Sequence, residues 1–314
     1  MTALTGQWED SHAFYTFESF ALPPAVYRME VISGRKKHWA TVAAPVQAEE
    51  YAVEQTWYRS RDGTPVSMFV VHRKDLMHDG RRPTLLTGYG GFNVSLTPTF
   101  VGSLPLWLER GGVYAVPNLR GGGEYGEEWH RAGMLDRKQN VFDDFIAAAE
   151  HLVAEGYTSP ERLTISGGSN GGLLMGAALT QRPDLFRAVT CAVPLLDMLR
   201  YHRFLIARLW IPEYGSADDP EQFPFIYAYS PYHRVQDGTP YPAVLLHTAA
   251  SDGRVDPMHA RKMAALLQAQ STGGPVLLRV ETQAGHGAGK PLSKTIDEQT
   301  DLWSFRFWQL GLEV

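Results

Sequence analysis

The alternation of two kinds of segment over residues 163–311 constrains the fold more than any other feature of the sequence. Short apolar runs, such as AVLLH at residues 243–247, are typical of strands buried on both faces of a sheet. Between these runs lie segments with the spacing of amphipathic helices. Strands that alternate with helices predict a doubly wound α/β fold, in which helices cover both faces of a mostly parallel sheet. The predicted strands are residues 162–168, 187–194, 241–252 and 275–285, and the predicted helices are residues 170–181, 257–270 and 292–311.

The sequence indicates a small N-terminal unit followed by a main domain. Residues 1–50 hold short aromatic and β-branched runs broken by prolines, which indicate the short strands of a small β unit. Residues 51–314 are interpreted as the main domain. Its first predicted strands are residues 62–74, 81–91 and 111–122, and they are followed by a predicted helix over residues 140–156 with Gly156 as its C-cap.

Charge and cysteine content exclude several classes of partner. The formal net charge of -5 argues against nucleic acid or an anionic membrane as the main partner. Cys191 is the one cysteine, so no internal disulfide forms, and it is expected to be a small buried hydrophobe rather than a catalytic thiol. The N-terminus lacks the pattern of a signal peptide, and no apolar stretch approaches the roughly 20 residues of a membrane span. A soluble, cytoplasmic protein is therefore expected.

One serine lies between glycines where a predicted strand meets a predicted helix. Residues 167–171 read Gly-Gly-Ser-Asn-Gly, which matches the Gly-x-Ser-x-Gly pattern of a nucleophile elbow around Ser169. The sharp turn is expected to strain the serine backbone, and a Cβ on its small neighbours is expected to strike the adjacent strand or helix. Asp252 and His286 follow two later strands, in the chain order that accompanies this motif. We therefore predict Ser169 as nucleophile, His286 as general base and Asp252 as the group that orients it.

Each of these residues has a plainer alternative. Asp252 has the sequence position of an N-cap for the helix that follows it, and His286 has that of an ordinary histidine in a glycine-rich loop. Two other histidines compete as the base, but His247 lies within a strand and His259 within a helix. Only His286 stands at a strand end, so it remains the preferred base.

An acyl-transfer site also needs donors for the oxyanion. The backbone N–H of Asn170, directly after the serine, is one candidate. The phenol of Tyr89, in the loop TGYGGFN after an early strand, is the other, and packing of Tyr89 beside its glycines is the open alternative.

Several of these motifs together resemble the prolyl oligopeptidase family of serine peptidases, over about 300 residues of the chain. The similar segments are GYGGFN, NLRGGGEYGEEWHRAG, GGSNGG, SDGRVDPMHA and AGHGAGKP. The resemblance implies an α/β-hydrolase fold, the triad of Ser169, Asp252 and His286, and an oxyanion hole made by Tyr89 and the N–H of Asn170. It also implies a proline pocket, with Trp210 stacking on the substrate ring and Arg254 holding a substrate carbonyl. The implied pocket residues are Trp210, Tyr214, Phe92, Leu195, Val255 and Arg254. The alternative for Trp210 is a core or surface aromatic.

The chain departs from the family in one respect. Family members carry a seven-bladed propeller over the site, and residues 1–50 resemble only its last blade and the linker that returns from it. The chain is expected to be a shortened form of a longer protein or a relative without a propeller. An open site follows from either, and exposed edges of the β unit make it the expected contact of a homo-oligomer.

These features lead to three hypotheses for function. The preferred one is a serine hydrolase that cleaves short peptides after proline through an acyl-enzyme. The second is a carboxylesterase, because an open site still cleaves activated esters. The third is a binding protein on a non-catalytic scaffold, which the intact Ser/Asp/His set disfavours. No metal site and no cofactor are expected, because the chain lacks H-E-x-x-H and P-loop patterns.

Overall fold

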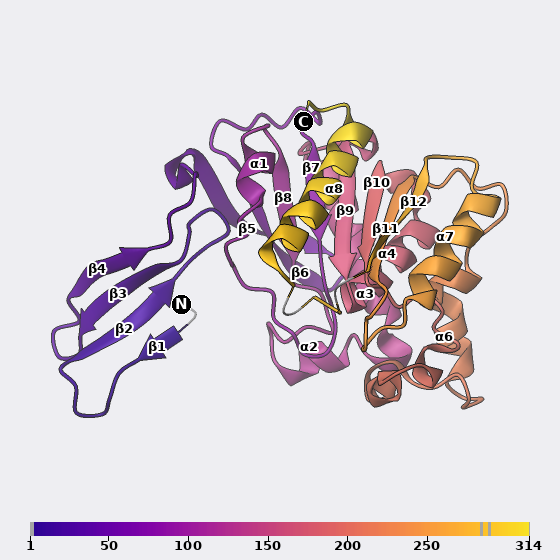
Figure 1. The fold of residues 1–314 in the computed structure, drawn as a ribbon, viewed down its shortest axis with the longest axis horizontal. Coiled ribbons are helices and arrows are strands. Elements are labelled where there is room, and N and C mark those ends of the chain that lie inside the picture. Colours follow the sequence, from indigo (N-terminus) through magenta and orange to yellow (C-terminus); the bar gives the residue numbers. More distant parts are fainter. Residues whose placement is uncertain (1–2, 283–284, 288–289, 314) are drawn as a thin grey trace. The chain divides into compact units, whose positions relative to one another are not determined.

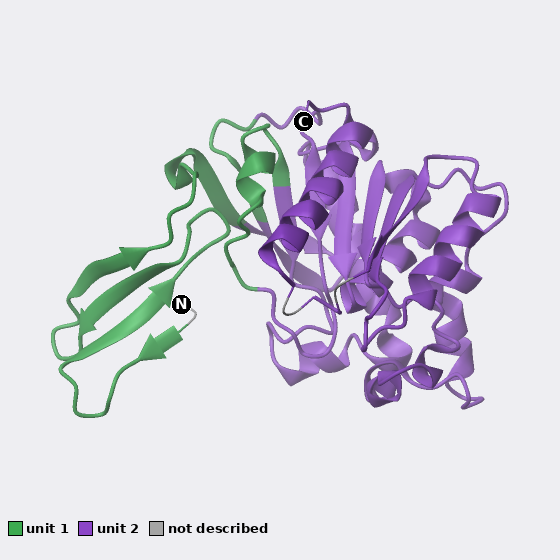
Figure 2. Cartoon of the chain, viewed as in Figure 1, with its two compact units in different colours: residues 1–54, 70–76, 97–113 green, residues 55–69, 77–96, 114–314 purple. Residues whose placement is uncertain are grey.

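The computed structural model describes residues 3–282, 285–287 and 290–313. The chain divides into two compact units (Figure 2). The first comprises residues 1–54, 70–76 and 97–113, and the second comprises residues 55–69, 77–96 and 114–314. Among the helices that the structure describes, none is long and apolar enough to cross a membrane.

The N-terminal part of the first unit is a four-stranded antiparallel sheet. Its strands follow one another in chain order and are β1 (Ala3–Thr5), β2 (His12–Phe17), β3 (Ala25–Glu30) and β4 (Lys36–Thr41). Cross-strand aromatic contacts support it, because the rings of Tyr15 and Tyr27 stack with centroids 5.3 Å apart. The predicted short strands of residues 1–50 are thus confirmed, while their assignment to a last propeller blade stays a prediction.

The remaining strands form one eight-stranded sheet in the order β12-β11-β10-β9-β7-β8-β6-β5 (Figure 1). The four pairs from β7 to β12 along this order are all parallel, which confirms the mostly parallel sheet predicted from the alternation. The strands are β5 (Tyr51–Arg59), β6 (Pro65–Arg73), β7 (Thr84–Thr87), β8 (Val113–Pro117), β9 (Leu163–Gly168), β10 (Ala188–Ala192), β11 (Ala243–Ala249) and β12 (Val276–Glu281). The helices are α1 (Leu104–Leu108), α2 (Glu127–Arg131), α3 (Gln139–Ala154), α4 (Asn170–Gln181), α5 (Ile211–Tyr214), α6 (Phe223–Tyr229), α7 (Met258–Gln270) and α8 (Leu292–Leu310).

Apolar strands in the centre of this sheet are covered on both faces. All seven residues of β11 are buried, as a strand covered on two sides requires. Figure 1 shows α8 on one face of the central strands and α3 and α4 on the other. On the α8 face, Leu302 and Phe305 pack with Leu245 of β11 in one buried cluster. Cys191 is buried in β10, as expected for a small hydrophobe.

Helix α3 ends where its sequence predicted. Gly156 has a φ of +72°, and the N–H of the next residue, Tyr157, donates to the carbonyl of Leu152 at 3.0 Å. A left-handed residue just past the helix is the usual position of such a glycine. Between β10 and β11 the chain forms only short helices, and this segment supplies one wall of the candidate site.

Candidate active site

Ser169 lies at the junction of β9 and α4 with a backbone conformation that few non-glycine residues adopt. Its φ is 58° and its ψ is −119°, so the predicted backbone strain is present. The Ser169 N–H donates to the carbonyl of Ala192 at 2.9 Å, which ties the turn to the end of β10. The helix that begins at Asn170 directs its free N–H groups toward this turn, where they favour negative charge.

The glycines around Ser169 do not all have the same role. A Cβ on Gly167 would lie 2.4 Å from the carbonyl oxygen of Gly171, and a Cβ on Gly171 would lie 2.7 Å from that of Gly88. Both positions therefore require glycine for close backbone approach. Gly168 differs from our expectation, because the nearest atom to a Cβ there is 3.5 Å away, an ordinary contact distance.

Three polar side chains from three strand ends meet at this turn. His286 Nε2 lies 3.2 Å from Ser169 Oγ, and His286 Nδ1 lies 2.6 Å from Asp252 Oδ2. The side chain of Asp252 is fully buried and that of His286 is 13% exposed. Strands β9, β10, β11 and β12 are successive neighbours in the sheet and all parallel, so their carboxyl ends share one edge of it. The arrangement allows His286 to take a proton from Ser169 while Asp252 stabilises the charged ring.

Asp252 is held in its buried position by its own loop. Its Oδ1 accepts hydrogen bonds from the N–H groups of Arg254 at 2.8 Å and Val255 at 3.0 Å. Burial raises the pKa of this carboxyl, but the hydrogen bonds from His286 and from the two N–H groups outweigh burial and leave the pKa below its usual value. The N-cap alternative is wrong, because α7 begins at Met258 and the side chain that accepts its N–H is Asp256.

The two histidines that compete with His286 as the base are both buried and make contacts within the fold. His247 is buried in β11, with Nε2 3.3 Å from Arg279 and 3.5 Å from Glu298. His259 is buried in α7, and its Nδ1 accepts hydrogen bonds from the N–H groups of Leu196 and Asp197 at 3.3 and 3.1 Å. A ring nitrogen that accepts from two backbone donors carries no proton, so His259 is neutral in the folded state.

The burial of His259 predicts that the folded protein loses stability in acid. Burial lowers the pKa of His259 from 6.5 to about 4, so between these pH values the unfolded chain binds a proton that the folded chain excludes. The free energy of unfolding should therefore fall as pH decreases from 6.5 to 4, by about 3 kcal/mol from this residue. His259→Asn can accept the same N–H groups without titrating. Its free energy of unfolding, measured in urea at pH 7 and at pH 4.5, should therefore differ less between the two pH values than that of the wild type. The control His38→Asn, on exposed β4, should show the same decrease as the wild type. If His259→Asn also showed the wild-type decrease, this assignment would be contradicted.

The two candidate oxyanion donors both lie close to Ser169. Burial raises the pKa of the Tyr89 phenol, and a hydrogen bond with Ser169 partly opposes that rise, so the phenol is a protonated donor at neutral pH. Tyr89 and Ser169 also line one cavity, so the role of the phenol as second oxyanion donor stays a prediction that this placement supports. Asn170 contributes the first backbone N–H of α4, and its side-chain Nδ2 donates to the Tyr89 carbonyl. Its side chain thus links the serine turn to the loop that carries Tyr89.

A cavity of about 190 Å³ opens beside Ser169. Its lining residues are Tyr89, Phe92, Val94, Ser169, Leu195, Trp210, Tyr214 and Arg254. The Phe92 ring meets the rings of Trp210 and Tyr214 edge to face, with centroids 6.5 and 5.4 Å away. Five of the six predicted pocket residues thus lie around it. The sixth, Val255, is buried and is not among the lining residues, although its N–H donates to Asp252. Val94 lines the cavity without having been predicted.

A charged cluster behind this cavity also escaped the sequence analysis. Glu213, between Trp210 and Tyr214 in the chain, is 5% exposed, and its carboxylate contacts Lys138 and His130. Burial lowers the pKa of Lys138 to about 8, against the opposing effect of Glu213. The only sign of this cluster in the sequence was a glutamate beside the pocket aromatics. Among the described residues, no group of three or more His, Cys, Asp or Glu side chains could hold a metal ion.

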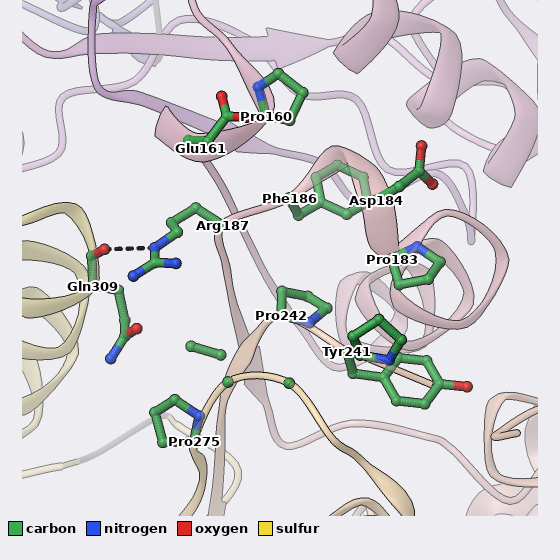
Figure 3. Close-up of a pocket in the computed structure, with 14 residues that line it drawn as sticks. Pro160, Glu161, Pro183, Asp184, Phe186, Arg187, Tyr241, Pro242, Pro275 and Gln309 are labelled. Carbon is green, nitrogen blue, oxygen red and sulfur yellow. Dashed lines mark hydrogen bonds between the residues drawn. The ribbon is translucent and has the colours of Figure 1, made fainter. Parts of the chain in front are cut away.

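A second cavity, of about 430 Å³, lies at the opposite edge of the sheet (Figure 3). Its lining includes Glu161, Arg187, Pro242 and Pro275, which lie just before β9, β10, β11 and β12. The starts of parallel strands face away from the edge where Ser169 lies. Although this cavity is larger than the one beside Ser169, its lining holds neither Ser169 nor His286, so the smaller cavity is the candidate active site.

Comparison with known proteins identifies relatives of the whole chain. The model of the prolyl oligopeptidase family matches residues 98–313. A prolyl endopeptidase of Elizabethkingia miricola is 44% identical over 310 residues, which cover 98% of this chain and 44% of the relative. A prolyl endopeptidase of Dictyostelium discoideum is 40% identical over 306 residues, which cover 94% of this chain and 40% of the relative.

Solved structures give the same result. A structure from a study of two prolyl endopeptidases has a TM-score of 0.95 and 56% identity, over 99% of this chain and 46% of that one. A post-proline cleaving enzyme from Rickettsia typhi has a TM-score of 0.93 and 36% identity, over 99% of this chain and 45% of that one. The chain therefore spans less than half the length of these relatives, and the expected α/β-hydrolase fold is confirmed. The family match and the near-complete coverage of this chain together show that it belongs to the prolyl oligopeptidase family.

Proposed function

We propose that the chain is the catalytic part of a serine peptidase that cleaves short peptides after proline through an acyl-enzyme. The observation that carries this proposal is the continuous contact from Asp252 through His286 to Ser169 beside an aromatic-walled cavity. The names of the relatives, which include prolyl endopeptidase and post-proline cleaving enzyme, agree with it. No cofactor is required by this chemistry.

The first half of the proposed reaction forms the acyl-enzyme. Ser169 Oγ attacks the carbonyl carbon of the scissile bond as His286 Nε2 takes the hydroxyl proton. The carbonyl oxygen becomes an oxyanion, which accepts hydrogen bonds from the Tyr89 phenol and the Asn170 N–H. The C–N bond then breaks, and His286 returns its proton to the departing amine.

The second half releases the acid product. A water molecule gives a proton to His286 and attacks the acyl carbon, the same donors stabilise the second oxyanion, and the C–O bond to Ser169 breaks with return of the proton to Oγ. Asp252 remains charged throughout and stabilises the imidazolium, consistent with the lowered pKa of its carboxyl.

The cavity beside Ser169 supports the preference for proline. Its aromatic walls are flat and apolar, and its volume of about 190 Å³ suits one small ring rather than a long side chain. Proline has a ring to bury and no N–H that would need a partner there. Arg254, whose side chain lines the same cavity, is placed in this proposal on a substrate carbonyl.

Replacement of Trp210 tests the peptidase proposal against the esterase alternative. For a blocked Gly-Pro anilide, Trp210→Ala should lower kcat/KM by about 10- to 100-fold, equivalent to about 1.4–2.8 kcal/mol of lost ring contact. Hydrolysis of a short-chain nitrophenyl ester, which leaves the pocket empty, should change by less than about threefold. Trp308→Ala, at a tryptophan 58% exposed on α8, is the matched control. If wild type cleaves only the ester, the chain is a carboxylesterase on a peptidase site. If it cleaves a Gly-Ala anilide as well as the Gly-Pro anilide, the pocket does not select proline.

Three further sequence predictions belong to this proposal. Residues 1–50 are a short β-strand segment from a last propeller blade and the linker that returns from it, and residues 51–314 form the α/β-hydrolase catalytic domain. The protein acts in the cytoplasm, in keeping with its one buried cysteine. Copies of the chain associate through the exposed strands of the N-terminal unit, since β4 is exposed along its whole length.

A further inference from the structure

We propose that Glu213, together with Lys138, is a positioning residue that holds the loop of residues 89–93 in its active conformation. This inference rests on the proposed function, because it assigns Glu213 an effect on catalysis that passes through Tyr89. Glu213 itself does not line the cavity beside Ser169. It acts on the backbone of the loop from behind.

The loop that carries Tyr89 has an unfavourable backbone conformation. Gly90 has a φ of 61°. After Gly91, the residues Phe92 and Asn93 have φ values of 56° and 57°. Glycine adopts such angles freely, but a bulky residue such as Phe92 does so only when its surroundings compel it. Some contact outside the loop must therefore select this conformation.

Two charged side chains supply that contact. Lys138 Nζ donates to the carbonyl of Gly90 at 2.9 Å, and the N–H of Phe92 donates to Glu213 Oε1 at 3.0 Å. The two anchored groups flank Gly91, at the centre of the loop. Hydrogen bonds that involve a charged partner are the stronger kind, and burial keeps water from competing for these.

The two charges depend on each other. Lys138 Nζ lies 3.5 Å from Glu213 Oε1, and the side chains are 1% and 5% exposed. Glu213 Oε2 also lies 2.8 Å from His130 Nε2. Removing one member of a buried pair leaves the other as an uncompensated charge, so loss of the Glu213 charge should disturb both anchors.

The same cluster connects the pocket to the oxyanion donors. Glu213 lies in α5 directly before Tyr214, whose hydroxyl donates to Asn170 Oδ1 at 2.8 Å. Asn170 Nδ2 in turn donates to the carbonyl of Tyr89. Pocket wall, loop and serine turn are thus joined by hydrogen bonds at both ends of the loop, and Glu213 is the one charged acceptor among them that contacts the loop backbone.

A double-mutant cycle separates a positioning role from a general loss of stability. Glu213→Gln keeps the shape of the side chain but leaves the Lys138 cation without its countercharge. With Tyr89 present, this change should lower kcat for the nitrophenyl ester about tenfold with KM within about twofold. In a Tyr89→Phe background it should lower kcat by less than about twofold, because the donor that it positions is already absent. Equal losses in the two backgrounds, or no loss with Tyr89 present, would overturn the proposal.

Hydrogen exchange gives a second readout that does not depend on activity. Amide exchange of the peptide covering residues 88–96 should be at least tenfold faster in Glu213→Gln and in Lys138→Met than in the wild type. Lys262→Met, which removes one of the cationic partners of the buried carboxylate Asp197, is the control and should leave this exchange unchanged. If the wild type hydrolyses neither substrate, the proposed function fails, and unchanged exchange in both variants would overturn the positioning role independently.

Discussion

Replacement of Ser169 by alanine should lower kcat for both the proline anilide and the nitrophenyl ester by a factor on the order of 10⁴ or more. The reason is that Ser169 supplies the atom that bonds to the substrate, and its hydroxyl lies 3.2 Å from the His286 Nε2 that takes the proton. Some rate above that in water should persist, because the oxyanion donors and the cavity are unchanged. Steady-state kinetics on both substrates measure the effect.

A control substitution and a labelling experiment test the assignment of Ser169 as the nucleophile. Ser251→Ala, on the exposed loop before Asp252, should retain wild-type rates. A fluorophosphonate should label the wild type at Ser169, identified by mass spectrometry of the modified peptide, and should not label Ser169→Ala. Hydrolysis that survives the Ser169 substitution at full rate would place the chemistry elsewhere.

Replacement of Asp252 by asparagine should reduce kcat by a factor on the order of 10³–10⁴ while leaving the loop folded. The asparagine oxygen can still accept the N–H groups of Arg254 and Val255, which hold the turn in the native protein. Its NH₂ group would then face His286 Nδ1, which must accept, so the ring proton would move to Nε2. With Nε2 protonated, His286 can no longer act as the base for Ser169.

The Asp252 prediction differs from simple unfolding in a measurable way. The melting temperature of Asp252→Asn should change by only a few degrees, and fluorophosphonate labelling of Ser169 should slow along with hydrolysis. Asp256→Asn is the matched control, because this carboxylate lies in the same loop and accepts the N–H of Met258 without contacting His286. If Asp252→Asn kept wild-type kcat, the contact from Asp252 to His286 would have no part in the reaction.

The parts of the site that the sequence predicted are those fixed by regular structure. Alternating strands and helices place the residues that follow β9, β11 and β12 at one edge of a parallel sheet, so Ser169, Asp252 and His286 were expected to meet, and they do. The glycine pattern also carried information, because Gly167 and Gly171 mark close backbone approach. Gly168 shows the limit of that reasoning, since the pattern has glycine where a Cβ has room.

The parts that sequence reasoning missed depend on contacts between distant segments without periodicity. Glu213 reads as a surface charge, and only the fold brings Lys138, 75 residues away, to pair with it in a buried position. Val94 lies in an irregular loop, where no pattern says which way its side chain points. Strand β5 was missed because its middle residues are polar and exposed, unlike the apolar strands at the centre of the sheet.

The burial of Cys191 has a practical consequence for studying this protein. Its Sγ donates to the carbonyl of Gly172, and burial raises the pKa of the thiol well above its usual value, so maleimide reagents should leave it unmodified in the folded state. A cysteine introduced at an exposed position, such as Trp308→Cys, would then be the single reactive thiol of the chain. A fluorophore or spin label attached there would report on the native molecule without any substitution of the natural cysteine.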